Sequence, residues 1–559
     1  MLETVSSSLP WLGLILGYGI LTHGIILLND GLYWDGWLVD LWQQNGDRDS
    51  MRRFYSEVGM PNLYFEHWFL GRFFWRQTAY RVVSLVSILT IAISVFWIAV
   101  YTNIFSPPQA AMISLFLLSY PVYAVTFDGV VSLQYTFKIA LFYVGCFFAV
   151  TTINTFDAAH IFLFTCSLIL FIEAFNANSL LVYFGGFLLF YAWLVHVKSP
   201  GGFEIFEYLK LFLLTILPIA YWIIKETLAP RHGYYKDYNK LRVSRIFIPL
   251  YIGFEAFRYG IDVPMIKPIR EMATTKNVSF IFMSLLLGSL AFQFGNGLST
   301  VPMLQALQIL LIGYALLFLG ALPFMVVGQH FAEGGWSSKN FMLFHLPFAL
   351  VVFGWLQLLP DSFNTVLIPI ILVANTIYIV KVHLLYIAVS IKDKALMRWL
   401  ATNSHISSAS VIKIRDAHWI EYPFEYKEDI FRPAYLSCMV KRIWPGSRIL
   451  TILDDWNSSS GRSLTPEEIE QVLEATTIRY SFAPQVQPGS QYQVTIAAPV
   501  ERFDASKTPK AFDEAGDVSP SKQPAMIKMA LEYLYLKWLS SRRMDKWFEK
   551  HFSISALEL

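Results

Sequence analysis

Three aspartates are the strongest candidates for chemistry in this sequence. Asp30, Asp35 and Asp40 recur every five residues in the segment NDGLYWDGWLVDLW, directly after a long apolar run. This spacing differs from the helical i, i+4 repeat, so one regular helix would spread the three carboxylates over its surface. Asp30 follows ILLN at the edge of the apolar run, where partial desolvation raises the pKa of a carboxyl group toward the range of a general base. We therefore predict that Asp30 is a reactive carboxylate, with Asp35 as the second candidate.

The rest of this loop, residues 29–78, is rich in aromatic and ionisable side chains. Its tryptophans are typical of the aromatic belt at a membrane surface: Trp34, Trp37, Trp42, Trp68 and Trp75. That interpretation leaves Glu66 and His67 unexplained, because they stand inside the apolar run NLYFEHWFL. We therefore predict a substrate-binding role for both.

Two further acids lie beside apolar runs. Asp128, in SYPVYAVTFDGVVSLQYTFK, follows Pro121 and lies between two such runs, where an ionisable group needs a partner or water. A simple turn residue is the alternative interpretation of Asp128. Glu173 ends a run in FIEAFNANS and would reach the same membrane face as the first loop, although a structural role at a helix end also explains it.

A basic and aromatic segment, KETLAPRHGYYKDYNKLRVSR, separates two later apolar runs. Its cations are Lys225, Arg231, His232, Lys236, Lys240, Arg242 and Arg245, and they alternate with tyrosines. Arginine binds phosphate in bidentate geometry and lysine binds it as a point charge. The alternative is a topology signal, because positive residues accumulate on the cytoplasmic side of membrane proteins. We predict a phosphate site that includes Arg231, His232, Lys240, Arg242 and Arg245.

Other site classes find little support in the sequence. The net charge is +2 and there is no basic tract, so we expect no nucleic-acid partner. The three cysteines, Cys146, Cys166 and Cys438, are far apart and show neither metal-ligand spacing nor a disulfide framework. The loop VVGQHFAEGGWSSKNFMLFHLP holds His330, Glu333, Lys339 and His345, but their spacing matches no zinc motif.

The elements that must position these residues are mostly membrane helices. Of the 559 residues, 55% are hydrophobic and 15% are charged, against about 25% charged in soluble domains. Apolar runs near the length of a membrane span recur at 9–28, 80–102, 109–126, 134–152, 159–175, 179–197, 211–228, 247–261, 278–297, 303–328, 341–359 and 366–386. The sequence therefore predicts a polytopic α-helical membrane protein with about twelve spans, of which the short run 247–261 is alternatively re-entrant. The first run lacks the features of a cleaved signal peptide.

Hydrophobicity falls after Ile391, which predicts a transmembrane domain over 1–391 and a soluble α+β domain over 392–559. Strand-like runs, RILTILDD and YQVTIAAP, alternate there with turn-rich segments. The last helix, in PAMIKMALEYLYLKWLSSRRMDKWFEKHF, is amphipathic. It either packs on its own domain or lies on the membrane surface.

The first part of the chain resembles the GT-C superfamily of integral-membrane glycosyltransferases, which includes protein O-mannosyltransferases and lipid A aminoarabinose transferases. The resemblance rests on the acid just past the first helix, on MPNLYFEHW in place of a proline-aromatic segment, and on Pro121 with Asp128. It covers about the first 200 residues by pattern. It implies a GT-C-like fold, a polyprenyl-phosphate sugar donor, and a first loop that carries the acid acting as base or contacting a metal.

Together these observations predict inverting transfer of a sugar from polyprenyl phosphate to a lipid, glycan or protein acceptor, at the outer face of an inner membrane. Asp30 would accept the proton of the acceptor hydroxyl, and Asp35 or Asp128 would orient the acceptor or a divalent cation, Mg²⁺ or Mn²⁺. The basic segment would stabilise the departing lipid phosphate, and Tyr33 and Trp34 would stack on a sugar.

Two other functions remain open: a transporter or flippase of lipid-linked sugars, and a polysaccharide polymerase or ligase. A transporter should place ionisable residues near the middle of several spans, whereas here they concentrate at span ends and in loops. The topology also contains a conflict. With a cytoplasmic N-terminus, the first loop and the basic segment lie outside, against the positive-inside rule, while Lys267, Arg270, Lys276, Lys392, Lys394 and Arg398 lie inside.

Overall fold

The computed structural model describes residues 2–73, 76–121, 132–198, 205–232, 236, 248–274, 301–329, 331, 336–409, 411–416, 433–445, 450–453, 491–497, 523–538 and 544–558. Several predicted features therefore lie outside the described residues: Asp128, Lys240, Arg242, Arg245, His330, Glu333 and the span 278–297.

In the described part of the chain, 7 helices are long and apolar enough to cross a membrane. They are α1 (Leu2–His23) with η1 (Gly24–Leu28), α5 (Arg76–Tyr101), η3 (Ser132–Phe137) with α8 (Lys138–Thr151), α10 (Ser179–Lys198), α11 (Ile205–Leu228), α15 (Met303–Met325) and α17 (Asp361–Thr402). Each falls on a predicted span, which confirms the helical membrane character of the chain.

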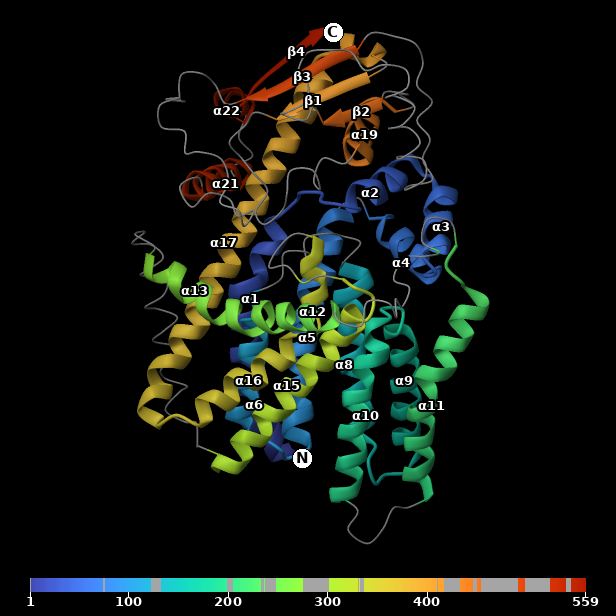
Figure 1. Ribbon diagram of the computed structural model, residues 1–559, viewed down its shortest axis with the longest axis vertical. Helices are drawn as coiled ribbons and strands as arrows, with labels where there is room; N and C mark the ends of the chain where they lie inside the picture. The colour runs from blue at the N-terminus through green and yellow to red at the C-terminus, as the bar shows by residue number, and fades with distance from the viewer. Residues whose placement is uncertain are drawn as a thin grey trace.

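Shorter helices occupy four other predicted spans. They are α6 (Pro107–Leu118), α9 (Ala158–Ala174), α16 (His345–Gln357), and α12 (Ile248–Phe257) continued by η6 (Arg258–Asp262) and α13 (Val263–Thr274). The α12 to α13 segment runs across the bundle (Figure 1). A 10-residue helix such as α12 is about 15 Å long, half the thickness of the hydrocarbon core. The number of twelve spans stays a prediction.

The longest helix joins the membrane bundle to the C-terminal part of the chain. α17 has 42 residues, which makes it about 63 Å long, or twice the hydrocarbon thickness. Figure 1 shows it rising from the bundle to the sheet at the opposite end from the N-terminus. The predicted boundary between residues 391 and 392 falls inside this continuous helix.

The first loop folds into three short helices, α2 (Gly36–Asn45), α3 (Arg48–Glu57) and α4 (Asn62–Leu70). Gly46 ends α2 in the left-handed conformation, at φ 65°. Asp47 then caps α3, because its Oδ1 accepts a hydrogen bond from the backbone amide of Ser50 at 3.0 Å. Gly59, at φ 76°, makes the turn between α3 and α4.

The C-terminal part contains a four-stranded mixed sheet in the order β2-β1-β3-β4. The strands are β1 (Val411–Asp416), β2 (Leu450–Leu453), β3 (Gln491–Ala497) and β4 (Ser553–Glu558). β1 is parallel to β2 and β3, and β4 is antiparallel to β3. The accompanying helices are η8 (Ser404–Ser408), α19 (Pro433–Ile443), α21 (Gln523–Trp538) and α22 (Met544–His551). β2 and β3 confirm the two strands predicted from RILTILDD and YQVTIAAP.

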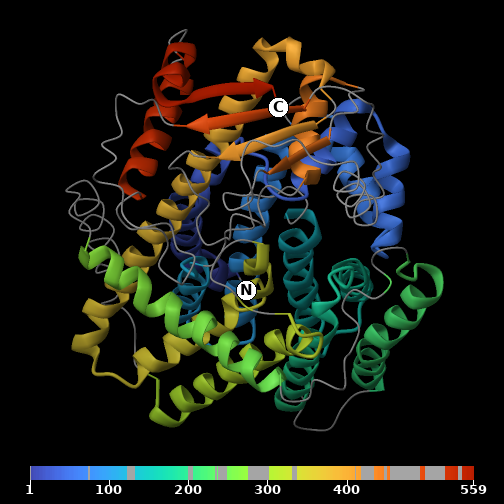
Figure 2. The same cartoon turned by 45° about the horizontal axis from the view of Figure 1, so that its top comes forward.

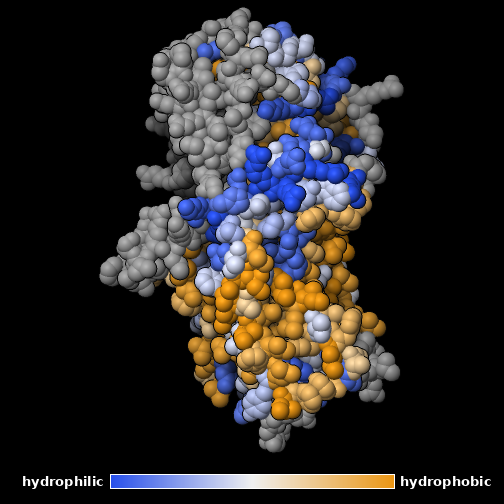
Figure 3. Space-filling view, turned by 90° about the vertical axis from the view of Figure 1, so that its right-hand side faces the viewer, coloured by the Kyte–Doolittle hydropathy of each residue, from blue (hydrophilic) through white to orange (hydrophobic). Residues whose placement is uncertain are grey.

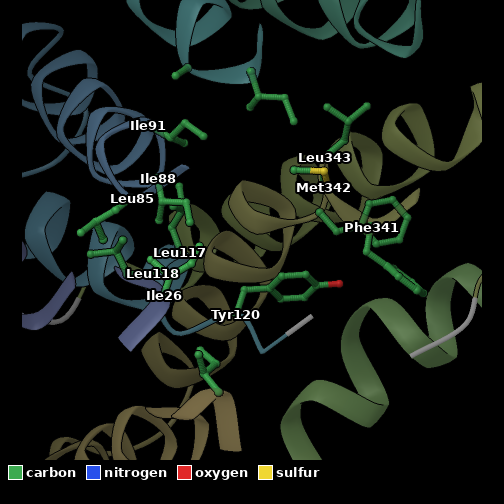
Figure 4. Packing of buried hydrophobic residues seen from close by; sticks show 14 of the residues in the cluster. Ile26, Leu85, Ile88, Ile91, Leu117, Leu118, Tyr120, Phe341, Met342 and Leu343 are labelled. Carbon is green, nitrogen blue, oxygen red and sulfur yellow. The ribbon is translucent and has the colours of Figure 1, made fainter. Parts of the chain in front are cut away.

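The surface and the core match a membrane-embedded bundle with a polar end. Figure 3 shows a hydrophobic surface over the lower part of the molecule and a hydrophilic surface above it. Figure 2 shows the first-loop helices and the sheet together at the polar end. Inside the bundle, apolar side chains of η1, α5, α6 and η7 (Trp336–Phe341) pack together (Figure 4); they include Ile26, Leu85, Ile88, Ile91, Leu117, Leu118 and Phe341.

Candidate functional site

Asp30 is held by cations of the C-terminal part of the chain. It forms ion pairs with Lys394 of α17 and with Lys537 of α21, whose Nζ lies 2.9 Å from Asp30 Oδ2. Burial raises the pKa of Asp30, but the charges of Lys394 and Lys537 outweigh burial and lower the pKa from 3.8 to about 2. The predicted rise of this pKa is therefore wrong, because the sequence did not indicate the two lysines. A carboxylate with so low a pKa is a poor general base at neutral pH.

Asp40 also joins the first loop to the C-terminal part. It is fully buried and pairs with Arg442 of α19, whose Nη1 lies 2.9 Å from Asp40 Oδ2. Gln77 and Gln44 donate hydrogen bonds to its two oxygens, at 2.7 and 3.1 Å. Asp35 is half-buried at the start of α2. Burial raises the pKa of the Cys438 thiol in α19, and the nearby charges of Asp40 and Asp35 add to the rise.

These contacts correct the expected topology. The sequence argument placed the first loop outside and Lys394 inside, on opposite faces of the membrane. Lys394 instead pairs with Asp30, and α19 pairs with Asp40, so the first loop and the start of the C-terminal part share one end of the molecule. The reason is the length of α17, which extends through the bundle to the end where the first loop lies. It therefore brings Lys394, and α19 after it, to that end.

Tyr33 and Trp34 are core residues, so the predicted stacking on a sugar ring is wrong. Their exposed fractions are 1% and 6%. The Tyr33 hydroxyl lies 2.7 Å from the carbonyl oxygen of Tyr386, and both rings pack against the Tyr386 ring. Arg81 fixes the adjoining backbone, because its Nη2 donates a hydrogen bond to the carbonyl oxygen of Gly31 at 2.7 Å.

A buried lysine brings together two acids that the sequence indicated separately. Lys138 is completely buried at the start of α8 and forms ion pairs with Glu66 of α4 and Glu173 of α9. Burial is the main cause that raises the pKa of Glu66, to about 7; Glu173 adds to the rise and Lys138 opposes it. Glu66 Oε2 has no hydrogen-bond partner among the described residues. One cation thus serves two carboxyl groups, and the pKa of Glu66 is raised from its ordinary value toward neutral pH.

The contacts of Glu173 extend to the end of α11. The Asn176 amide donates a hydrogen bond to Glu173 Oε1 at 3.1 Å, and Asn176 Oδ1 accepts one from the Tyr221 hydroxyl at 3.1 Å. One turn further along α11, Lys225 Nζ donates to Asn178 Oδ1 at 2.6 Å. The carboxyl pair is therefore connected through Asn176 to a buried lysine on a neighbouring helix.

The segment after α11 returns to the first loop and closes a ring of contacts. The backbone amide of His232 donates to the carbonyl oxygen of Glu57 at 3.2 Å. Arg231 packs over Gly59, where an added Cβ would lie 3.0 Å from Arg231 Cγ and 3.1 Å from the carbonyl oxygen of Ala229. We call this set the polar ring; it comprises Glu57, Gly59, Glu66, Lys138, Glu173, Asn176, Tyr221, Lys225, Arg231 and His232.

His67 lies inside the first loop and positions α4. It is fully buried, stacks on the Tyr55 ring at 4.9 Å, and its Nδ1 lies 2.8 Å from the Tyr80 hydroxyl. Burial lowers the pKa of His67 to about 3, so the imidazole is neutral. Its burial excludes direct contact with a substrate in this conformation, and its contacts with Tyr55 and Tyr80 hold α4 against α3 and α5.

The structure thus joins Glu66 to Glu173 through Lys138, and it places Arg231 and His232 against Gly59 and Glu57 of the first loop. Asp30 has a different set of partners, Lys394, Lys537 and Tyr533. The sequence argument missed Lys138, Asn176 and Tyr221. Lys138 had a usable signal, because an ionisable residue inside an apolar run needs a partner. Among the described residues, no group of three or more His, Cys, Asp or Glu is placed to hold a metal ion.

Comparison with known proteins adds no relative to these observations. No protein-family model, no curated protein and no solved structure matches the chain. The likeness to GT-C glycosyltransferases therefore rests on the residues quoted above.

Proposed function

We propose that this chain is a membrane glycosyltransferase that moves a sugar from a polyprenyl-phosphate carrier to an acceptor at the membrane surface. The polar ring is the observation that carries the proposal. It combines a carboxyl group whose pKa is about 7 with Lys225 and Arg231 at the end of a lipid-facing helix. A lipid-linked sugar needs such cations for its phosphate and an apolar path for its chain.

The outer side of α11 supplies that apolar path. Phe212, Ile219 and Ile223 are 57%, 56% and 53% exposed, and they lie along α11, which ends at Leu228 shortly after Lys225. A polyprenyl chain lying along these side chains would bring its phosphate to the end of α11, where Arg231 follows and Lys225 lies on the inner side of the helix. The sugar would then lie toward Glu66 and Lys138.

In the proposed reaction Glu66, rather than Asp30, is the general base. The acceptor hydroxyl attacks the anomeric carbon and gives its proton to the Glu66 carboxylate, while the bond from that carbon to the phosphate oxygen breaks. The leaving polyprenyl phosphate keeps the electron pair, and Lys225 and Arg231 stabilise its charge. Lys138 fixes the position of Glu66 and shares its charge with Glu173.

The test uses the purified chain in nanodiscs with radiolabelled polyprenyl-phosphate mannose, glucose and aminoarabinose, and a membrane extract as the source of acceptors. We expect one donor to be consumed, and Glu66→Gln to lower its turnover about 100- to 10,000-fold. Binding of polyprenyl phosphate should be unchanged in this variant. Glu226→Gln, an equal charge change at an exposed site beside the ring, is the control. Wild-type turnover by Glu66→Gln would exclude Glu66 as the base.

The proposal keeps the finer features predicted from the sequence: about twelve spans, a separate soluble domain after the bundle, and an active site on the extracytoplasmic side of an inner membrane. Accessibility of cysteines introduced into α3 to a membrane-impermeant reagent in intact cells tests the side.

A transporter of lipid-linked sugars is the second candidate. Asn375 and His383 are both 1% exposed in the middle part of α17, which places polar groups inside the bundle as transport requires. Movement of a labelled polyprenyl-phosphate sugar across proteoliposomes without loss of its sugar would favour this candidate over transfer.

A further inference from the structure

The helix α21 has one face packed on the molecule and an apolar face left exposed. Met526, Met529 and Tyr533 are buried on the side that meets α17. On the other side Leu531 and Trp538 are 52% and 79% exposed. These two belong to a stripe at helical spacing, Ile527, Leu531, Leu534 and Trp538, and Tyr535 beside it is 61% exposed.

Contacts with Asp30 place α21 at the level of the membrane boundary. The first candidate span ends at Leu28, two residues before Asp30. Tyr533 and Lys537 both reach Asp30: the Tyr533 hydroxyl lies 3.5 Å from Oδ2 and Lys537 Nζ lies 2.9 Å from it. With Leu28 taken as the end of the hydrocarbon core and 3.8 Å between consecutive residues, the tips of Tyr533 and Lys537 lie within about 10–15 Å of that end, in the zone of the lipid headgroups.

The polar side of α21 turns toward the C-terminal helix α22. Glu532 Oε2 accepts a hydrogen bond from Trp547 Nε1 at 3.2 Å and lies 3.5 Å from His551 Nε2. In Figure 1, α22 lies beyond α21 on the side away from the membrane helices. At 100° per residue, the Leu531–Trp538 stripe points well away from Glu532, so it is not directed toward α22.

We propose that α21 lies in the headgroup region of the bilayer, with the Leu531–Trp538 stripe in contact with lipid. Tryptophan and tyrosine favour this zone because their rings combine apolar faces with a polar group. Lys528, exposed beside the stripe, extends toward the lipid phosphates. The same helix carries Lys537, which pairs with Asp30 of the first loop. Contact of α21 with the membrane would therefore stabilise the packing of the C-terminal part against the first loop. This inference is independent of the proposed catalytic function.

The test measures the depth of α21 in nanodiscs. Trp538→Cys is labelled with an environment-sensitive fluorophore in a Cys166→Ser background, since Cys146 and Cys438 are buried. Lys546→Cys, exposed in α22, is the matched control, and Tyr535→Cys is a second reporter. We expect brominated lipids to quench the Trp538 and Tyr535 labels severalfold more strongly than the control, and aqueous iodide to show the reverse order.

Two outcomes would overturn the proposal. Iodide quenching of the Trp538 label equal to that of the control would place the stripe in water. Protection of the Trp538 label from both quenchers would mean that protein, such as a second copy of the chain, covers the stripe. All three label positions are exposed in the folded chain, so none of the three variants removes a buried side chain.

Discussion

Two charge clusters, each built on a buried lysine, join α8 to α11, one at each end of these helices, and they differ in the balance of acids and cations. At the far end from the first loop, Lys210 pairs with Glu207 at 2.7 Å. Glu207 also accepts hydrogen bonds from the backbone N–H of Asn154 at 2.9 Å and from the Tyr191 hydroxyl at 3.4 Å, and Lys210 donates to the carbonyl oxygen of Thr155 at 3.0 Å. One cation meets one acid, and the remaining atoms of both groups have partners.

At the near end, Lys138 meets two acids, and one oxygen of Glu66 has no hydrogen-bond partner in the described part of the chain. Both clusters are formed by similar residues in similar helices. The balanced pair clamps the turn between α8 and α9, as a structural ion pair does. The unbalanced set carries an excess negative charge, which favours retention of a proton. The difference shows that the ratio of acids to cations, and not burial alone, separates a structural ion pair from a site whose carboxyl group can exchange a proton.

The largest expected effect comes from breaking the balanced pair. Glu207→Gln leaves Lys210 buried without a counter-charge, and removal of one partner from a buried pair costs about 3–5 kcal/mol of stability. Denaturant titration in detergent micelles measures the loss. Glu66→Gln should cost far less in the same titration, because Glu173 still neutralises Lys138. Equal losses in the two variants would contradict the comparison.

The next effect is a pH dependence that only the unbalanced set should show. Burial above all raises the pKa of Glu66 from 4.5 to about 7. At Glu66 the folded chain therefore binds more protons than the unfolded chain between these values, so the Glu66 contribution to stability is greatest below pH 4.5 and decreases as the pH rises toward 7. Buried His67, whose pKa is lowered from 6.5 to about 3, contributes the opposite slope in this interval, so the Glu66 contribution is read only as a difference between variants. Asp30, whose lowered pKa gives the opposite slope, acts below pH 3.8 and does not interfere.

Thermal unfolding at pH 4.5, 5.5, 6.5 and 7.5 measures the Glu66 contribution as the difference between wild type and Glu66→Gln. We expect this difference to change sign or shrink steadily across the interval, since glutamine does not titrate. A difference that stays constant with pH would mean that Glu66 has an ordinary pKa.

Features encoded by local sequence patterns were predictable, whereas pairings between distant residues were not. Membrane helices and strands follow from local patterns, so seven spans and the strands β2 and β3 were predictable. Glu66, Glu173 and Arg231 stood out individually, because charged residues near apolar runs need an explanation. Their common partner did not: Lys138 is 72 positions from Glu66 and 35 from Glu173, and no local pattern encodes such a pairing.

The pKa of Asp30 also depends on partners that are distant in the sequence. Desolvation at the end of the first span was a sound inference, and burial does raise its pKa. The lysine that reverses the result is 364 positions away. It reaches Asp30 because α17 continues to Thr402, whereas hydrophobicity falls after Ile391. A hydropathy profile marks where a helix leaves lipid, and it does not mark where the helix ends.

A smaller effect is expected at Gly59, where Arg231 closes the polar ring. Gly59→Ala adds a Cβ at 3.0 Å from Arg231 Cγ to a backbone that already has φ 76°. Gly46→Ala is the matched control, since Gly46 has φ 65° and no atom within 4 Å of its added Cβ. Left-handed strain alone costs about 1–2 kcal/mol in each variant. The stability that Gly59→Ala loses beyond the loss in Gly46→Ala, measured by thermal unfolding, reports the contact with Arg231. Equal losses would mean that Arg231 moves away from the added Cβ without cost.

The smallest effect is expected at Asp30. Its pairs with Lys394 and Lys537 are partly exposed, and ion pairs of this kind contribute about 0–1 kcal/mol. Asp30→Asn should therefore leave the folded chain almost as stable as wild type, with turnover close to normal, because the proton acceptor lies in the polar ring. Limited proteolysis of the C-terminal part should become faster, since the ion pairs of Asp30 with Lys394 and Lys537 are lost while Asp40 and Arg442 stay paired. Asp30→Asn with complete loss of turnover and unchanged proteolysis would return the role of base to Asp30. The unbalanced set around Lys138 would then be a second clamp.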